Sequence, residues 1–258
     1  EHVITADTGG IVRELTVAAG DTVFEGHPLA FVEPAEVAGA VTARDDDGDL
    51  DAIRPDLAEV LKRQAVTQDA ARPDAVARRR KTGQRTAREN IADLCDPGSF
   101  VEYGALTVAA RRQRNTLEEL IERTPADGMV MGLGRVNGDQ FPDERARVAA
   151  IAYDYTVLAG TQGMRNHAKT DRAFDLAARR RLPVVLFAEG GGGRPGDTDY
   201  PVVSALDTRA FALWARLSGI VPRIAVVKGR CFAGNAVLAG TSDLIVATRD
   251  ASLGMGGP

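Results

Sequence analysis

Cysteine is scarce in this chain of 258 residues, which contains only Cys95 and Cys231. Two cysteines cannot build the disulfide framework of a small secreted domain, so we expect a protein of the reducing cytoplasm. Long hydrophobic runs are also lacking, since none reaches the length that spans a membrane, and no signal-peptide pattern opens the sequence. With 44% hydrophobic residues, the chain is predicted to be soluble and globular, with one large domain or one large and one small domain.

An excess of positive charge is missing as well, because 32 Lys and Arg stand against 36 Asp and Glu. The net charge of −4 gives no general basis for binding nucleic acid, although local basic segments exist. The acidic stretch 41–56 misses the EF-hand frame, because Leu50 stands where a calcium loop begun at Asp45 needs glycine. We therefore predict a solvated linker in this stretch and no metal site.

The pattern of the first hundred residues changes twice. Residues 1–40 carry short β-rich runs separated by Gly-Asp and Glu-Gly turns, which predicts a small β module. Residues 41–77 hold the linker and a helix, and a helical pattern with basic clusters continues through 74–100 to an Asp-Pro-Gly stop. Thr116 and Glu119 then have the spacing of a capping box at the start of another helix.

Strands and helices alternate from about residue 128 onward. Strands are predicted at 128–136, 146–158, 183–188 and 223–229, helices at 164–181 and 203–219, and a further segment with a short apolar helix at 231–247. Repeated strands followed by helices indicate an α/β domain with buried strands.

Four consecutive glycines, 190–193, follow the apolar strand 183–188. A phosphate loop is unlikely to be the explanation, because Arg194 and Pro195 stand where lysine and serine or threonine should follow. Dinucleotide binding is also poorly supported, because Asp207, the only acidic residue near the required distance, falls within a helical pattern. Two interpretations remain, namely a cradle of backbone amides for an oxyanion and a merely flexible loop.

A second glycine-bearing turn, GRCFAGNA at 229–236, follows the strand 223–229 and precedes a short helix. Open α/β sheets place ligands beyond the carboxyl ends of their strands, where these two turns are both predicted to lie. Two such loops can aim their amides at one point, which is what a developing enolate oxygen requires. The second turn therefore favours the oxyanion interpretation over the flexible loop.

Five blocks in order carry a resemblance to a known family. They are RTARENIADLCDPGSFVEYG (85–104), DGMVMGLGRVNG (127–138), YDYTVLAGTQG (153–163), GGGGR (190–194) and GRCFAGNAVLAGTSDLIVA (229–247). With these blocks, residues 78–258 resemble the N-terminal half of the carboxyltransferase of biotin-dependent acyl-CoA carboxylases. The resemblance implies an α/β fold of the crotonase-like (ClpP/crotonase) class, a ββα superhelix. It also implies a second half beginning after Pro258, so we expect the sequence to be a fragment of a longer polypeptide.

The family resemblance further implies a mechanism without a side-chain base. Carboxybiotin releases CO₂, its ureido group takes the α-proton of an acyl-CoA, and the enolate attacks CO₂. By position, the thioester oxyanion would lie against Ala233 and Gly234, with Gly191 and Gly192 as the neighbouring wall. Contacts with coenzyme A would come from Gly160, Thr161, Arg165, Lys169, Gly193, Arg194 and Asn235. The alternative for the basic residues of helix 164–181 is a solvated helix face. We expect His167 to be structural or exposed, and Cys231 to be a small packed residue rather than a nucleophile.

The sequence departs from the family at Ala233, where glycine is common, at Asn235, and in RPGDTD after the glycine run. These departures leave the amides in place and bear on substrate details. Because the oxyanion site would need bare backbone, we expect Gly234→Val or Gly192→Val to abolish carboxyl transfer with little loss of folding, and Asn235→Ala to do much less.

The first forty residues resemble half of a biotinyl carrier domain, in the segment VAAGDTVFEGHPL (17–29). Glu36 stands where that resemblance would place the biotinylated lysine, and residues 1–61 contain no lysine at all. We therefore expect a module without biotin, either a relic or a docking element, and biotin carried on another segment or a partner.

The resemblance thus implies an acyl-CoA carboxylase carboxyltransferase of fatty acid metabolism, with acyl-CoA as substrate. Its partners would be biotin carboxylase and biotin carboxyl carrier domains or subunits, in a homo- or hetero-oligomer, with no nucleic acid or membrane. Two alternatives stay open. One is a biotin-dependent decarboxylase or transcarboxylase subunit, and the other is a catalytically degenerate scaffold subunit of such a complex.

Overall fold

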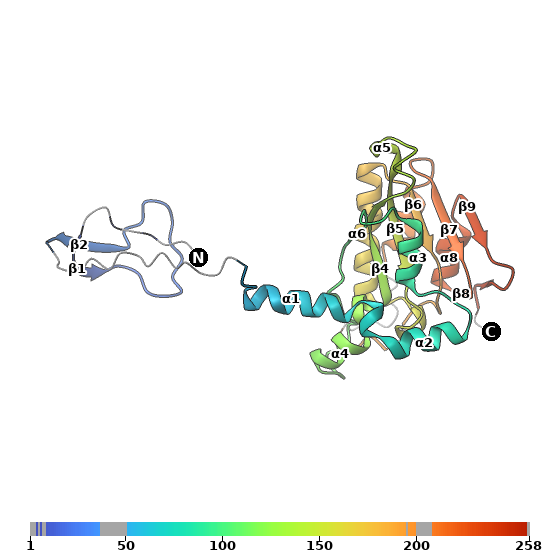
Figure 1. Ribbon diagram of the computed structural model, residues 1–258, viewed down its shortest axis with the longest axis horizontal. Coiled ribbons are helices and arrows are strands. Elements are labelled where there is room, and N and C mark those ends of the chain that lie inside the picture. Colours follow the sequence, from blue (N-terminus) through green and yellow to red (C-terminus); the bar gives the residue numbers. More distant parts are fainter. Residues whose placement is uncertain are drawn as a thin grey trace. The chain divides into compact units, whose positions relative to one another are not determined.

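The computed structural model of the chain describes residues 4, 6, 9–36, 51–194, 196–199 and 208–256. The chain forms two compact units, 1–54 and 55–258 (Figure 1). The stretch 41–50 of the expected linker and the start of the expected helix 203–219 lie outside the described residues. Within the described residues, no helix is both long and apolar enough to span a bilayer.

The first unit contains one antiparallel strand pair, β1 (Gly10–Leu15) and β2 (Ala30–Pro34). Its large apolar side chains remain exposed, with Leu15 at 71% and Phe24 at 76%. A two-stranded sheet buries too little surface for independent stability in water. The described part of this unit therefore has no hydrophobic core of its own.

The second unit begins with short helices. They are α1 (Pro55–Val66), η1 (Asp69–Ala71), α2 (Pro73–Lys81), α3 (Ala87–Leu94) and α4 (Leu117–Arg123). The capping box of Thr116 and Glu119 is confirmed, since each binds the backbone N–H of the other. The continuous helical pattern expected over 74–100 is instead two helices, because Gly83 adopts a left-handed φ of 68° between them.

A six-stranded mixed sheet forms the centre of this unit, in the order β3-β4-β5-β6-β7-β9. Its strands are β3 (Val101–Glu102), β4 (Met129–Arg135), β5 (Arg147–Tyr153), β6 (Val184–Phe187), β7 (Arg223–Val227) and β9 (Leu244–Ala247). Strands β3, β4 and β5 are antiparallel, whereas β5, β6, β7 and β9 run parallel. Around them lie η2 (Pro125–Gly128), α5 (Asp143–Ala146), η3 (Leu158–Gly160), α6 (Met164–Arg180), α7 (Ala210–Arg216) and α8 (Gly234–Gly240).

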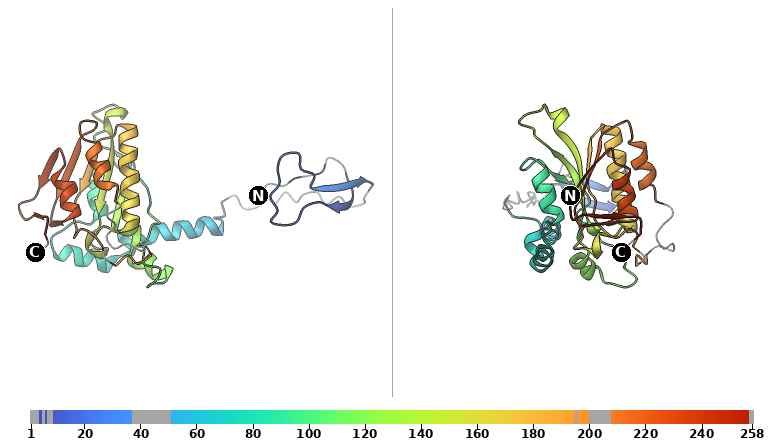
Figure 2. Two further views of the ribbon diagram at one scale, coloured as in Figure 1. Left: turned by 180° about the vertical axis from the view of Figure 1, so that it is seen from behind. Right: turned by 90° about the vertical axis from the view of Figure 1, so that its right-hand side faces the viewer.

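Helices cover both faces of the sheet, with α3 on one side and α6 on the other (Figure 2). Alternate residues of a strand point to opposite faces, and the strand sequences follow this rule. Met129 and Ile151 pack into the core with α6 and α7, whereas Val130 and Ala150 pack against α3. Both faces are therefore buried, which explains why β4 and β5 read as nearly continuous apolar runs.

A second, short parallel arrangement lies beyond the carboxyl ends of the parallel strands. Strands β8 (Arg230–Phe232) and β10 (Ser252–Gly254) pair in parallel, and Gly190 bridges to Cys231 of β8. Gln162 bridges in the same way to Gly193. Each parallel strand of the main sheet is thus followed by a segment of this second layer. This is the ββα repeat that the sequence resemblance implied.

Candidate functional site

The glycine run is held in place by backbone hydrogen bonds on two sides. Gly190 donates to the carbonyl of Arg230 at 2.7 Å and accepts from the amide of Phe232 at 2.9 Å. On the other side, the amide of Gln162 donates to Gly192 O at 2.6 Å, and the amide of Arg194 donates to Gln162 O at 2.8 Å. A backbone paired in this way has a defined course, which argues against the flexible-loop interpretation.

Two positions of the run require glycine. Gly190 and Gly192 have φ values of 128° and 84°, in the region that other residues rarely adopt. A methyl group on Gly190 would overlap the carbonyl oxygen of Gly160, and one on Gly192 would lie 2.5 Å from Cβ of Ala233. By contrast, a methyl group on the exposed Gly191 would contact only Thr161 Cγ2, at 3.3 Å. The run is therefore packed at its even positions and open at Gly191.

The second turn lies directly against the first, as the sequence predicted. Ala233, before α8, has φ 48° and ψ −123°, and its amide donates to Gly254 O at 3.1 Å. The amide of Ala233 is therefore occupied, in contrast to the expectation that it faces the oxyanion. In the two turns, the backbone amides of Gly191, Gly192, Gly193, Gly234 and Asn235 have no hydrogen-bond acceptor among the described residues. Free donors of both turns thus come together.

Gly234 is closely packed, a feature that the sequence could not reveal. A methyl group there would overlap Gln162 Oε1 and approach Phe211 Cζ to 3.2 Å. Gln162 is only 4% exposed and donates through Nε2 to the hydroxyl of Tyr153 at 3.0 Å. The expectation that Gly234→Val or Gly192→Val would leave folding nearly intact is therefore corrected, because both side chains would collide with packed atoms.

The side chain of Asn235 connects the loops of the site by binding their backbone, including that of Gly160. The Asn235 side chain is fully buried, and its Nδ2 donates to Gly160 O at 3.2 Å and to Glu189 O at 2.5 Å. These bonds tie α8 to the loops after β5 and β6. Asn235 was expected to contact coenzyme A. In the structure, its side-chain nitrogen Nδ2 instead binds backbone carbonyls of the protein.

Two of the cations that were expected to contact coenzyme A are buried. Lys169 is 6% exposed, and its ammonium donates to the carbonyls of Ala126 and Met129 at 2.7 and 2.5 Å. Burial lowers the pKa of Lys169 to about 8, against the opposing charges of Glu102 and Asp127. Arg194 is 4% exposed and forms an ion pair with Asp127 at 2.5 Å. Both side chains therefore point into the protein rather than toward a ligand.

Arg165 and Thr161 lie nearer the surface. The side chain of Arg165 is 35% exposed, with its guanidinium 3.9 Å from a carboxylate oxygen of Asp199. The hydroxyl of Thr161 donates to Leu158 O at 2.6 Å and accepts from Arg194 Nε at 3.2 Å. Of the residues expected to contact coenzyme A, Thr161 and Arg165 are thus half-buried and Gly193 is exposed, whereas the others are buried.

The two residues that were expected to be structural are packed. Cys231 is fully buried in the core that α6 and α7 share, and burial raises the pKa of its thiol to about 12. Burial lowers the pKa of His167 to about 4, so this imidazole is neutral at physiological pH. Neither side chain is in the state that a nucleophile or a cationic ligand group would need.

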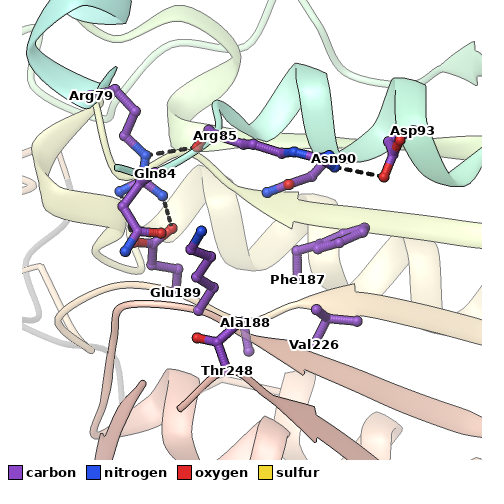
Figure 3. Close-up of a pocket in the computed structure, with 11 residues that line it drawn as sticks. Arg79, Gln84, Arg85, Asn90, Asp93, Phe187, Ala188, Glu189, Val226 and Thr248 are labelled. Carbon is purple, nitrogen blue, oxygen red and sulfur yellow. Dashed lines mark hydrogen bonds and ion pairs between the residues drawn. The ribbon is translucent and has the colours of Figure 1, made fainter. Parts of the chain in front are cut away.

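A polar cavity of about 350 Å³ opens between the α2–α3 connection and the carboxyl ends of β6 and β7 (Figure 3). Phe187, Ala188 and Val226 form its apolar part. Arg79 donates two hydrogen bonds to the carboxylate of Glu189, at 2.8 and 2.5 Å, directly before the glycine run. The sequence analysis missed this cavity, because the basic cluster 78–81 reads as a solvated helix face although Arg79 is 8% exposed.

The cavity also contains a cation that has no carboxylate partner. Arg85 is paired with Asp93 and Arg79 with Glu189, whereas Lys228 makes no ion pair within the part of the chain that the structure describes. Its ammonium donates to Gly83 O at 3.2 Å and is largely solvated. The cavity therefore carries one positive charge more than its two carboxylates balance, which suits an anionic group.

Bare amides presented by a second short layer, beyond the carboxyl ends of a parallel sheet, define a crotonase-like protein. The chain belongs to the carboxyl transferase domain family, which matches residues 78–258. This finding confirms the resemblance seen in the sequence.

Curated relatives and solved structures agree with this family. The 12S subunit of methylmalonyl-CoA carboxyltransferase from Propionibacterium freudenreichii subsp. shermanii is 31% identical over 189 residues, 71% of this chain and 33% of the relative. The beta4 subunit of a biotin-dependent long-chain acyl-coenzyme A carboxylase from Mycobacterium tuberculosis (strain H37Rv) is 32% identical over 203 residues, 75% and 34% of the two chains. The chain thus spans about a third of the length of these relatives.

Two solved structures cover most or all of the chain. A single-chain, multi-domain long-chain acyl-CoA carboxylase is 55% identical, with a TM-score of 0.76, over 100% of this chain and 24% of that chain. Transcarboxylase 12S with methylmalonyl-coenzyme A and methylmalonic acid bound is 28% identical, with a TM-score of 0.64. The match covers 80% of this chain and 39% of that chain.

Proposed function

We propose that this chain provides the amide-lined half of a carboxyltransferase site, in which a carboxyl group passes from carboxybiotin to the α-carbon of an acyl-CoA. The observation that supports this function is the meeting of two glycine turns with free amides at Gly191–Gly193 and Gly234–Asn235. Named relatives that carboxylate acyl-CoA thioesters support the same reaction. The 12S relative is named for carboxyl transfer with methylmalonyl-CoA, a thioester that already carries the carboxyl group, and this name supports the alternative of a decarboxylase or transcarboxylase subunit.

The free amides would act on the thioester oxygen. Removal of the α-proton places negative charge on that oxygen, and N–H groups already directed at it stabilise the charge without reorganising. The buried Asn235 and Gln162 hold the two turns together, so the donors keep their direction during the reaction. Carboxybiotin, when bound, supplies the carboxyl group and the base. No lysine is present among residues 1–61 to attach it, so its attachment site lies elsewhere.

We assign the anionic part of the thioester substrate to the cavity of Figure 3. Glu189 lines the cavity and directly precedes Gly190, so the cavity adjoins the start of the glycine run. Lys228 supplies the positive charge that the carboxylates of the cavity do not balance. Lys228→Gln should therefore raise the KM for acyl-CoA several-fold with kcat nearly unchanged, as expected for a contact equal in ground and transition states. An unchanged KM would show that the anionic part of the substrate does not bind in this cavity.

The function is tested by adding one methyl group at the open position of the run. Gly191→Ala should fold, because only Thr161 Cγ2 approaches within 4 Å, but it narrows the space before the free amides. We expect carboxyl transfer to fall by roughly tenfold or more, because the methyl group displaces the thioester oxygen from the amides and weakens hydrogen bonds made in the transition state. Gly240→Ala is the matched control, since a methyl group at the end of α8 meets nothing within 4 Å. Equal activity of both variants and the unmodified protein would contradict the amide site.

A further inference from the structure

A cluster of charged side chains is buried beneath the glycine run. Asp127 is fully buried, and Arg194, Asp197 and Lys169 are 4%, 6% and 6% exposed. Charges removed from water cost stability even when they are paired, and well-packed apolar residues are often at least as stabilising in such places. A purely structural role therefore explains this cluster poorly.

Arg194 uses its guanidinium to join three chain segments. Nη1 binds Asp127 Oδ1 at 2.5 Å and Asp197 Oδ1 at 3.4 Å. Nη2 donates to Thr161 O at 2.8 Å, and Nε donates to Thr161 Oγ1 at 3.2 Å. The start of β4, the loop after β5 and the end of the glycine run are therefore fixed to one planar group, whose fork geometry a lysine cannot reproduce.

Asp127 is itself held in an unusual backbone conformation. Ala126 and Asp127 have φ values of 52° and 47°, two successive left-handed residues without glycine. Their carbonyls accept from Lys169 Nζ and from Asn166 Nδ2, both on α6. A conformation of this kind persists only where the surrounding structure enforces it, and such sites gather at functional centres.

Asp197 connects the same cluster to the start of α6. Its Oδ2 accepts from the amide of Met164 at 3.0 Å, the first residue of that helix. The loop that follows the glycines is thus fixed to α6 by Asp197 and to β4 by Arg194. The other end of the run is fixed by the pairing of Gly190 with Cys231.

The three residues Gly191–Gly193 lie between these two ends, and their one pairing partner, Gln162, directly follows Thr161, which the Arg194 guanidinium also binds. Glycine loses more conformational freedom on ordering than any other residue, so a run of three does not hold its own amides in one direction. We propose that Arg194, oriented by Asp127, is a positioning residue that fixes the direction of the free amides of Gly191–Gly193. This inference rests on the proposed carboxyl transfer, and it gives Arg194 a role other than the coenzyme A contact expected from the sequence.

The test uses Arg194→Lys and Asp127→Asn in the protein as it is made in the cell. Arg194→Lys keeps the positive charge but loses the forked guanidinium. Asp127→Asn keeps the shape of the side chain but loses its negative charge. We expect kcat to fall by roughly tenfold or more with the KM for acyl-CoA changed less than about twofold, because the lost stabilisation belongs to the transition state. Amide hydrogen exchange in the segment 190–194, measured at Gly190 and Arg194, whose amides bond Arg230 O and Gln162 O, should rise in both variants, and this readout does not depend on activity.

Arg223→Lys is the matched control. Arg223 is 5% exposed and its fork binds Asp243 Oδ1 and Oδ2 at 2.8 and 3.2 Å, but it begins β7, at the end of the strand away from the glycine turns. This variant should lose stability without a change in kcat or in the exchange of 190–194. Unchanged exchange in Arg194→Lys, or faster exchange with an unchanged kcat, overturns the positioning role. Absence of transfer in the unmodified protein would instead overturn the proposed function, while the exchange result would still stand on its own.

Discussion

Ala233 is a single residue whose conformation favours glycine. Its φ of 48° and ψ of −123° are costly for a side chain with Cβ, typically by about 1–3 kcal/mol. Replacement by glycine relieves that strain. It also raises the conformational entropy of the unfolded chain, which lowers the free energy of unfolding by about 0.4–1 kcal/mol. We therefore expect Ala233→Gly to raise the free energy of unfolding by about 1 kcal/mol in urea denaturation. A decrease would mean that the packing of the Ala233 methyl group outweighs the strain.

Lys169 makes stability depend on pH at the residue scale. Its pKa is lowered from 10.5 to about 8, so between these values the folded protein holds one proton fewer than the unfolded chain. The contribution of Lys169 to the free energy of unfolding therefore rises with pH from about 8 to 10.5, by up to about 1.4 kcal/mol per pH unit. Lys169→Met removes this titration and leaves two buried carbonyls without a donor, at a cost of about 2–4 kcal/mol.

The measurement is the difference in unfolding free energy between the unmodified protein and Lys169→Met at several pH values. The difference is needed because Cys231, whose pKa burial raises from 9.0 to about 12, acts in the opposite direction above pH 9 in both proteins. The difference should widen between pH 8 and 10.5. A constant difference over this range would show that Lys169 stays protonated when buried.

At the scale of elements, the Arg79–Glu189 pair attaches α2 to the end of β6. Both side chains are about nine-tenths buried, so Arg79→Met leaves the Glu189 carboxylate buried without its partner. We expect this change to lower the free energy of unfolding by about 3–5 kcal/mol, and the double variant Arg79→Met with Glu189→Leu to recover much of the loss. Urea denaturation of Arg79→Met, Glu189→Leu and the double variant gives the coupling energy. A loss below about 1 kcal/mol for the single variant would contradict the importance of this attachment.

The elements of the α/β part could be predicted because their signals are local. The strands after residue 128 read as apolar runs, the capping box at Thr116 has a fixed spacing, and both glycine turns follow strands. The directions of Lys169 and Arg194 could not be predicted, because a long cationic side chain on a helix or loop has the same pattern whether it faces water or folds inward. Lys169 binds the carbonyl of Ala126 and Arg194 binds the carboxylate of Asp127, and these two residues form a left-handed kink that no residue type in that segment indicates.

At the scale of the whole molecule, the apolar core lies within one of the two units. The buried apolar residues among those described run from Ala87 to Ala239. Removal of residues 1–54 should therefore leave the unfolding midpoint of residues 55–258 within about 2 °C, since a loss of 1 kcal/mol would shift it by about 2–4 °C. Differential scanning calorimetry of the shortened and complete chains makes the comparison. A drop of more than about 5 °C would show that the first unit stabilises the second.

The short second layer also has a consequence for the order in which the chain folds. Gln162, the glycine run, β8 and β10 are joined by parallel pairing, although they span residues 162 to 254 of the sequence. Contacts between segments so far apart form late, because the loops that separate them must close first. The amides of the site therefore take their final direction only once the last of these segments has joined. A chain arrested midway through folding or synthesis would therefore have most of its helices but not the paired glycine turns on which the proposed oxyanion site depends.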